Sequence, residues 1–184
     1  MKLNRVKSIG AALIGLALVA ALVPEFFRYR AERRLYEASA LFRLLIAQGN
    51  AAAGETAMLD AVAALAMQAA EGLPGDSRPL ILAGSARLVE RRPDEALALY
   101  RRALSIGERA EIDLNLGRAW ALTGNRQAAS AAVLRAVWVS PALISALPEE
   151  VQAPLRAALA EDAQQLVSHR LSGPPPLPAG DRSE

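Results

Sequence analysis

The pattern of hydrophobic and polar positions divides the chain into an apolar N-terminal segment and a longer region of helical periodicity. Residues Ile9–Val23 form an uninterrupted apolar run of 15 residues after a short basic start. From residue 31 onward, apolar side chains recur at steps of three and four, which is the spacing of amphipathic helices. Hydrophobic residues make up 53% of the sequence but aromatic residues only 4%. We therefore predict an all-α protein, because β-sandwiches and barrels need β-branched and aromatic runs.

The apolar N-terminal segment is predicted to be a signal anchor over residues 1–30, with residues 9–27 crossing the lipid bilayer. A transmembrane helix needs about 20 mostly apolar residues, and residues 9–27 supply 19. Phe26, Phe27 and Tyr29, interleaved with arginines, are typical of the interface between membrane and water. A cleaved signal peptide remains the alternative, because Val19-Ala20-Ala21 has the small residues of a cleavage site.

Charge and composition indicate where such an anchor would lie. Residues 1–30 carry four net positive charges, and the remaining residues carry two net negative charges. A short basic N-terminus tends to stay in the cytoplasm, which predicts a periplasmic C-terminal domain. The abundance of alanine and arginine, with Lys2 and Lys7 as the two lysines, favours a bacterial source. The expected location is a bacterial inner membrane, crossed once.

A repeat of 33 residues is visible in the second half of the chain. Gly84 and Gly117 are offset by 33, and so are two sets of small and larger side chains that share one helical face. These sets are Ala96, Tyr100 and Ala103, and Ala129, Val133 and Ala136. We interpret each repeat as an antiparallel helix pair, in which the glycine marks a close crossing and the larger side chain fills the gap. Pro93 is placed to open one helix, and Gly124 suits a left-handed helix end.

These residues resemble the tetratricopeptide repeat. Residues 114–141 fit best, with Gly117, Trp120, the Gly124-Asn125 turn and Pro141 at the family's spacing. The preceding unit departs from the pattern, because Arg87 stands where the family prefers an aromatic residue. A third, degenerate unit is expected upstream, with helices over residues 36–48 and 55–71 separated by an insertion at 49–54. The resemblance implies a short α-solenoid over residues 31–147, behind the N-terminal transmembrane helix.

The C-terminal part is predicted to close this solenoid. Residues 148–171 have the amphipathic pattern of a capping helix, which repeat arrays need at their ends, and Pro154 is expected to break that helix. Residues 172–184 form a proline-rich tail that is expected to be extended or disordered. Trp120 and Trp138 are expected in the core.

The chemistry of the sequence argues against an enzyme. There is no cysteine and one histidine, His169, so no metal site of the His/Cys type can be assembled. No phosphate-binding glycine loop or nucleophile elbow is present. We expect no catalytic residues, no cofactor, no metal and no small-molecule substrate. We also expect no nucleic-acid partner, because the basic excess lies beside the anchor.

The resemblance implies a groove lined by the first helix of each pair, which binds a peptide or a partner helix. The residues that match this surface are Arg78, Ile81, Ser85, Leu88, Glu111, Leu114, Arg118 and Ala121. We therefore expect a membrane-anchored scaffold or adaptor, whose partners are proteins of a cell-envelope assembly such as a secretion, pilus, polysaccharide or cytochrome-maturation apparatus. The alternative is a structural accessory subunit of an integral-membrane complex, held there by its transmembrane helix.

Overall fold

A computed structural model describes residues 2–48, 55–168 and 173–177, with side chains described over 20–47, 56–168 and 173–177. The elements in chain order are α1 (Lys2–Gln48), α2 (Glu55–Gly72), α3 (Arg78–Val89), α4 (Pro93–Ile106), α5 (Ala110–Thr123), α6 (Arg126–Val139), the short 3-10 helix η1 (Pro141–Ala146) and α7 (Glu149–Val167). No strand occurs within these ranges. The prediction of an all-α fold is therefore confirmed for the described part of the chain.

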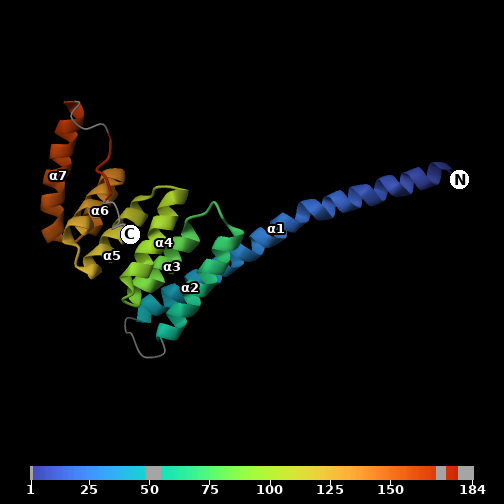
Figure 1. Cartoon of the computed structure of the whole chain (residues 1–184), viewed down its shortest axis with the longest axis horizontal. Coiled ribbons are helices and arrows are strands. Elements are labelled where there is room, and N and C mark those ends of the chain that lie inside the picture. The colour runs from blue at the N-terminus through green and yellow to red at the C-terminus, as the bar shows by residue number, and fades with distance from the viewer. Residues whose placement is uncertain (1, 49–54, 169–172, 178–184) are drawn as a thin grey trace, which may run out of the picture.

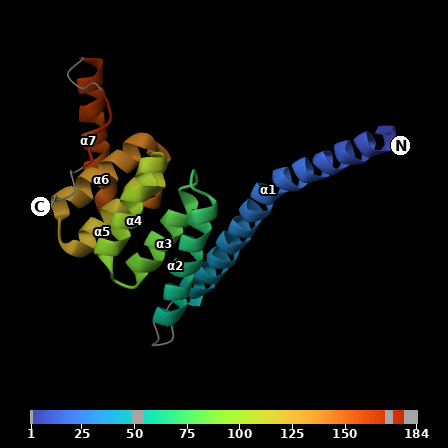
Figure 2. The same ribbon diagram turned by 45° about the vertical axis from the view of Figure 1, so that its right-hand side comes forward.

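The helices stack in the order in which they occur in the sequence. Each of α1 to α5 packs against the next helix, and α3 also touches α5. Figure 1 shows this row of helices, with α7 at one end and the N-terminal part of α1 projecting from the other. Figure 2 shows the same row from a second direction. The arrangement is consistent with a short helical solenoid, in which each helix buries its apolar face on its sequence neighbours.

Helix α1 is longer than the sequence pattern predicts. A separate helix over residues 36–48 was expected, whereas α1 runs without a break from Lys2 to Gln48 and contains Pro24. The domain begins on α1 at Ala31 and Leu35, which are buried against Ala69 and Leu73. Among the residues whose side chains are described, no helix is long and apolar enough to cross a membrane. Of the predicted span at residues 9–27, residues 9–19 lie outside that part.

The two repeat glycines lie where their helices approach most closely. A Cβ atom added at Gly84 of α3 would lie 2.6 Å from a ring carbon of Tyr100 on α4. A Cβ atom added at Gly117 of α5 would lie 2.6 Å from a methyl carbon of Val133 on α6. No real Cβ atom tolerates such distances, because they lie far inside van der Waals contact. The predicted close crossing at each glycine is confirmed, and the larger side chain of the partner helix lies at that crossing.

Most of the predicted helix ends are also confirmed. Helix α4 begins at Pro93, and Gly124 follows α5 in the left-handed conformation with a φ of 82°. The Asn125 side chain then caps α6 by accepting a hydrogen bond of 3.0 Å from the backbone N–H of Ala128. The predicted insertion at 49–54 lies outside the described residues.

The prediction that Pro154 breaks the last helix is wrong, because α7 runs through it. Pro154 is the sixth residue of α7, just beyond the first turn, whose N–H groups have no partner inside the helix. The missing N–H of proline therefore removes one hydrogen bond near the end of the helix and leaves the rest intact. Residues 173–177 of the tail lie against the domain, and residues 178–184 are outside the described part.

The main core lies between α3, α4, α5 and α6. Tyr100, Ile112 and Leu116 are fully buried there, and Trp120 is 6% exposed. Trp138 on α6 is half-buried rather than part of the core. A second cluster, which includes Val62 and Ala38, joins α1 and α2 to α3. The helices are thus held together mainly by alanine and leucine packing, as the composition predicts.

Candidate partner-binding groove

An apolar groove lies between α5, α6 and α7, and we call it the α5–α7 groove. Its volume is about 770 Å³. Residues of α5 form one wall, and residues of α6, η1 and α7 form the rest of the lining. Lining residues include Leu114, Gly117, Ala121, Val133, Leu134 and Leu155. This volume lies within the roughly 300–1,000 Å³ that is typical of ligand pockets.

The groove is open because α7 does not pack tightly against α6. The chain leaves α6 through η1, and α7 contacts only α6 and η1 among the described elements. Leu155 is the one buried residue of α7. The start of α7 is fixed by Gln152, whose side-chain amide donates a hydrogen bond of 2.9 Å to the carbonyl of Leu147. Helix α7 therefore closes the stack on one side and leaves apolar surface of α5 and α6 accessible.

Arg118 is the one charged residue that lines this groove. Its guanidinium donates a hydrogen bond of 3.0 Å to the side-chain oxygen of Asn115. Among the described residues it forms no ion pair. Arg118 is exposed, so its guanidinium can reach a carboxylate at the edge of the groove with the modest strength of a surface ion pair.

The structure divides the eight predicted groove residues between several environments. Leu114, Arg118 and Ala121 line the α5–α7 groove together. Glu111, one turn earlier on α5, is exposed. The four residues of α3 lie outside this groove: Arg78 lines a different, polar pocket, Ile81 is buried in the core, and Ser85 and Leu88 are partly buried.

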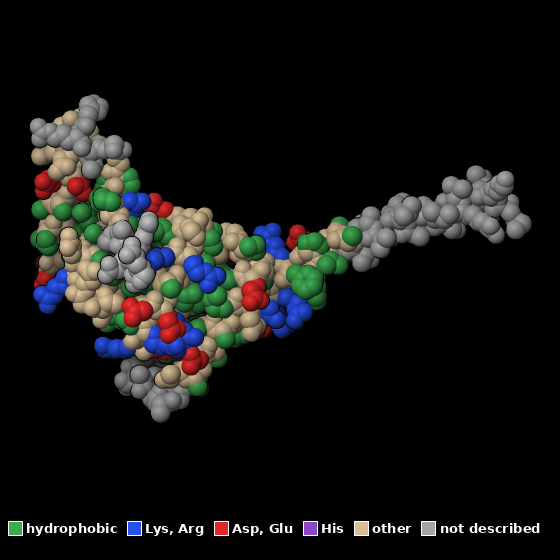
Figure 3. Space-filling view, in the orientation of Figure 1, with side chains coloured by type: hydrophobic (Ala, Val, Ile, Leu, Met, Phe, Trp, Pro, Cys, Tyr) green, Lys and Arg blue, Asp and Glu red, His purple; other side chains and the backbone are tan. Residues whose placement is uncertain are grey.

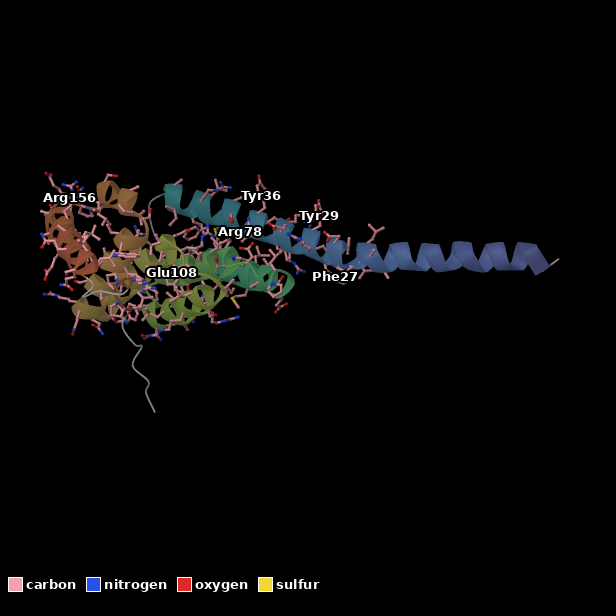
Figure 4. All side chains as sticks on the ribbon, turned by 90° about the horizontal axis from the view of Figure 1, so that it is seen from above. Phe27, Tyr29, Tyr36, Arg78, Glu108 and Arg156 are labelled. Carbon is pink, nitrogen blue, oxygen red and sulfur yellow. The ribbon has the colours of Figure 1, made fainter. Side chains whose placement is uncertain are left out.

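Arg78 forms ion pairs within the chain. Its guanidinium contacts Asp76 and reaches Glu32 of α1 at 3.0 Å. Burial alone would raise the pKa of Asp76, but the hydrogen bonds from Arg78 outweigh it and hold that pKa below its usual range. The pKa of Arg78 is raised, first by its hydrogen bond with Asp76. Arg78 thus ties the start of α3 to α1. Figure 4 shows Arg78 beside α1.

The Ser85 hydroxyl forms hydrogen bonds within α3 and across to α4. Its hydroxyl donates to the carbonyl of Ile81 at 2.8 Å and lies 3.2 Å from the hydroxyl of Tyr100. Burial raises the pKa of Tyr100 to about 12, so this phenol is neutral at physiological pH. This pair explains how a tyrosine hydroxyl is accommodated at the glycine crossing, since a buried hydroxyl needs a partner.

Sequence reasoning missed an ion network around Arg87, the residue that departs from the repeat pattern. Arg87 is 18% exposed and contacts Asp60 of α2, Glu90 and Glu95. The Glu90 side chain is 1% exposed. Burial has the largest single effect and by itself would lower the pKa of Arg87. The hydrogen bonds to Asp60 and Glu90, together with their charges, outweigh burial and raise that pKa. Arg87 therefore joins α2, α3 and α4 through charge where an aromatic side chain was expected.

A second missed cluster joins the α4–α5 loop, α6 and the tail. The guanidinium of Arg135 on α6 donates through Nε to Glu108 and through Nη1 to the carbonyl of Pro175, the latter at 2.7 Å. Asp113 of α5 lies near both charges and is fully buried. Burial and the neighbouring Glu108 raise its pKa to about 6, although Arg135 acts in the opposite direction. Figure 4 shows Glu108 in the middle of the domain, far from Phe27.

Helix α1 exposes large apolar side chains before it meets the domain. Leu22, Val23, Phe26, Phe27 and Tyr29 are between 46% and 66% exposed. Phe26 and Phe27 meet edge to face with ring centres 6.0 Å apart. Figure 3 shows hydrophobic side chains and arginines gathered where α1 enters the folded domain. Five large apolar side chains are thus exposed together on α1 just before the domain begins.

No metal centre is formed by the described residues, since no three His, Cys, Asp or Glu side chains converge there. His169 lies outside the described part of the chain.

No protein-family model, curated protein or solved structure matches this chain.

Proposed function

We propose that this chain is a membrane-anchored, tetratricopeptide-like scaffold that binds a segment of another protein in the α5–α7 groove. The observation that carries the proposal is the groove itself, with its volume of about 770 Å³ and its mainly apolar lining. Leaving apolar surface in water costs about 25 cal/mol for each Å² that a partner would otherwise bury. Binding of an apolar segment therefore gains free energy without any catalytic group.

The chemistry of the groove defines the occupant that we propose. An apolar peptide or helix fits between Leu114 and Ala121 on one side and Leu155 on the other. Arg118 then favours a segment that carries an acidic side chain at the edge of the groove. Helix-in-groove recognition of this kind relies on a few apolar anchors spaced at one helical face. The proposed partner is thus an apolar segment with one carboxylate, and the chain itself acts as an adaptor without turnover.

The anchor is supported by the sequence of the N-terminal segment and by the exposed side chains of α1. The apolar run of residues 9–23 ends in Leu22 and Val23, and Phe26 and Phe27 follow closely. These four side chains are between 46% and 65% exposed. Exposed aromatic residues next to arginines suit the headgroup region of a bilayer. We propose a single-pass location in a bacterial inner membrane, with the groove on the periplasmic side and a cell-envelope assembly as the setting.

A structural accessory subunit is the second candidate, and the same exposed side chains favour it. Phe26, Phe27 and Tyr29 would then pack on the helices of an integral-membrane complex, while the solenoid braces the contact. Replacing residues 9–23 by an unrelated membrane helix separates the two candidates. A scaffold keeps its partner after this exchange, whereas an accessory subunit loses its complex. A reporter that is active only in the periplasm, fused after residue 171, tests the side of the membrane.

The groove is tested by photo-crosslinking in cells, followed by binding measurements with the partner that is identified. A photoreactive residue at Ala121, inside the groove, is compared with one at Ala157, an exposed position of α7 that does not line it. We expect adducts from position 121 only. Ala121→Trp should then weaken binding of the purified partner at least about tenfold by filling the groove, whereas Ala157→Trp should leave binding unchanged. Equal adducts or equal affinities for both positions would refute the proposal.

A further inference from the structure

The C-terminal tail is docked on the domain by a short, proline-rich segment. Pro175 is buried, and its carbonyl accepts the hydrogen bond of 2.7 Å from Nη1 of Arg135. Two residues later, Leu177 packs against the main core cluster. Figure 1 shows this segment returning from the end of α7 towards α6. Five consecutive residues, Gly173–Leu177, thus behave as a bound extended peptide, with one backbone hydrogen bond and one apolar anchor.

Arg135 is the group that holds the backbone of this segment. Its Nε donates to Glu108, which fixes the direction of the guanidinium, while Nη1 reaches the tail carbonyl. The Arg135 side chain is 16% exposed, so these hydrogen bonds are largely protected from water. A proline-rich segment suits such a site, because its extended conformation is set in advance and little conformational entropy is lost on docking.

Asp113 lies beside this contact with no hydrogen bond of its own. Both of its carboxyl oxygens are buried and without a hydrogen-bond partner among the described residues. A buried carboxylate with no donor is costly, so the arrangement is that of the neutral acid. The charged groups that act on it are Glu108 from the α4–α5 loop and Arg135 from α6, and the tail contributes only a neutral carbonyl.

We infer that the surface around Arg135 is a binding site for an extended proline-rich segment, occupied by the chain's own residues 173–177 and released when Asp113 loses its proton. An ionised Asp113 offers Arg135 an acceptor of opposite charge, which adds the attraction of an ion pair to the hydrogen bond, whereas the carbonyl of Pro175 is neutral. The guanidinium then moves from the carbonyl of Pro175 to Asp113. The tail loses its backbone hydrogen bond, and only the Leu177 contact continues to hold it.

The sign of the pH dependence follows from the two states of Asp113. With the tail docked, burial holds the pKa of Asp113 at about 6. Once Arg135 pairs with it, the pKa falls to its ordinary value of about 4 or lower. The docked state therefore binds the proton more tightly, so docking is favoured at low pH and is lost as the pH rises through about 6. Between pH 5 and pH 7.5 the docking equilibrium constant should fall about tenfold.

The test measures tail docking by the distance between two spin labels on the full chain in detergent. The sequence has no cysteine, so Gly173→Cys and Ser105→Cys place both labels uniquely. A side chain at Gly173 meets no atom within 4 Å, and Ser105 is exposed on α4. A docked tail gives a narrow distance distribution and a released tail a broad one. We expect the ratio of narrow to broad populations to fall about tenfold from pH 5 to pH 7.5.

Three variants decide whether Asp113 and Arg135 are responsible. Asp113→Asn keeps the neutral shape and should remain docked at both pH values. Asp162→Asn, at another acid with an oxygen that lacks a partner, should keep the pH dependence of the unmodified chain. Arg135→Met should release the tail at both pH values. An unchanged pH dependence in Asp113→Asn, or a docked tail in Arg135→Met, would overturn the inference.

Competition by a free peptide tests whether the surface is a binding site in its own right. A synthetic peptide with the sequence of residues 172–178 is added at pH 5, where docking is strongest. We expect it to broaden the label distance distribution, and a peptide with alanines in place of its prolines to act at least about tenfold more weakly. Equal effects of the two peptides would show that the surface does not select a proline-rich segment and would overturn that part of the inference.

Discussion

The glycine crossing between α3 and α4 makes the strongest quantitative prediction, through the substitution Gly84→Ala. Two effects of opposite sign compete. Alanine is favoured over glycine inside a helix by about 1 kcal/mol. Against this, the new Cβ atom would lie 2.6, 2.9 and 3.0 Å from three carbons of the Tyr100 ring, which is fully buried.

The ring cannot move away cheaply, so the clash should win. Overpacking a close-packed core costs about 1–3 kcal/mol, and three ring carbons within 3.0 Å place Gly84→Ala in the upper half of that range. The free energy of unfolding should therefore fall by about 1–2 kcal/mol after the helix gain is subtracted. Urea unfolding followed by circular dichroism on the full chain in mild detergent measures this change.

A double-mutant cycle with Tyr100→Ala isolates the clash. Tyr100→Ala alone should cost about 3–5 kcal/mol, because it leaves a cavity. In that background the Cβ at position 84 has room, so Gly84→Ala should now stabilise by about 1 kcal/mol. Gly75→Ala, where a Cβ meets no atom within 4 Å, is the matched control and should change stability by less than about 0.5 kcal/mol. The reasoning fails if Gly84→Ala has the same sign with and without the tyrosine ring.

Three further predictions rest on charges and caps. Arg87→Met should cost about 1–3 kcal/mol, because it leaves the buried carboxylate of Glu90 with Arg92, at 3.5 Å, as its remaining cation. Arg33→Met, at an exposed pair, should cost less than about 0.5 kcal/mol, and urea unfolding compares the two. The pKa of Asp113 is raised to about 6 in the folded chain, so its stabilising effect is complete below the unfolded pKa of about 4 and is lost as the pH rises through 6. The chain should therefore lose about 1.4 kcal/mol from pH 5 to pH 7.5 relative to Asp113→Asn in parallel unfolding curves, and identical curves would contradict the raised pKa. Asn125→Ala removes the cap of α6 and should lower the thermal midpoint by a few degrees, equivalent to about 1 kcal/mol.

The repeat pattern predicted the fold well, because each repeat feature acts locally. Gly84 faces Tyr100 and Gly117 faces Val133 on the next helix. The number of residues between the glycine and its larger partner is the same in both pairs, so the same contact recurs in each repeat. Pro93 fixes its own φ at a value that suits the first turn of a helix, and Gly124 tolerates the positive φ of a helix end, so both positions follow from backbone geometry. The continuity of α1 was missed because residues 9–27 and 36–48 were assigned separately, as an anchor and as the first helix of a repeat, although no glycine or proline lies between them.

The candidate groove was predicted only in part. Leu114, Arg118 and Ala121 were predicted together because they share one face of α5, which the helical period determines, and all three line the α5–α7 groove. The other wall comes from η1 and α7, whose placement depends on how the chain leaves α6 and not on any periodicity. The docking of Pro175 on Arg135 was missed for a similar reason: a hydrogen bond to a backbone carbonyl 40 residues away leaves no trace in the side-chain pattern. The Arg87 network was missed because charges on a helix usually face solvent.

Because α1 is a single continuous helix, it fixes the direction in which the α5–α7 groove faces around the axis of that helix. From Lys2 to Ala31, where the domain begins, α1 advances about 1.5 Å per residue with no joint. Whatever holds the first turns of α1 therefore also sets the direction in which the α5–α7 groove faces. One residue inserted between Leu22 and Phe26 would turn the whole domain by about 100°, whereas seven inserted residues would restore its original heading to within about 20°. The length of the N-terminal helix thus determines the direction in which the groove faces. The side chains that line the groove determine what it can bind.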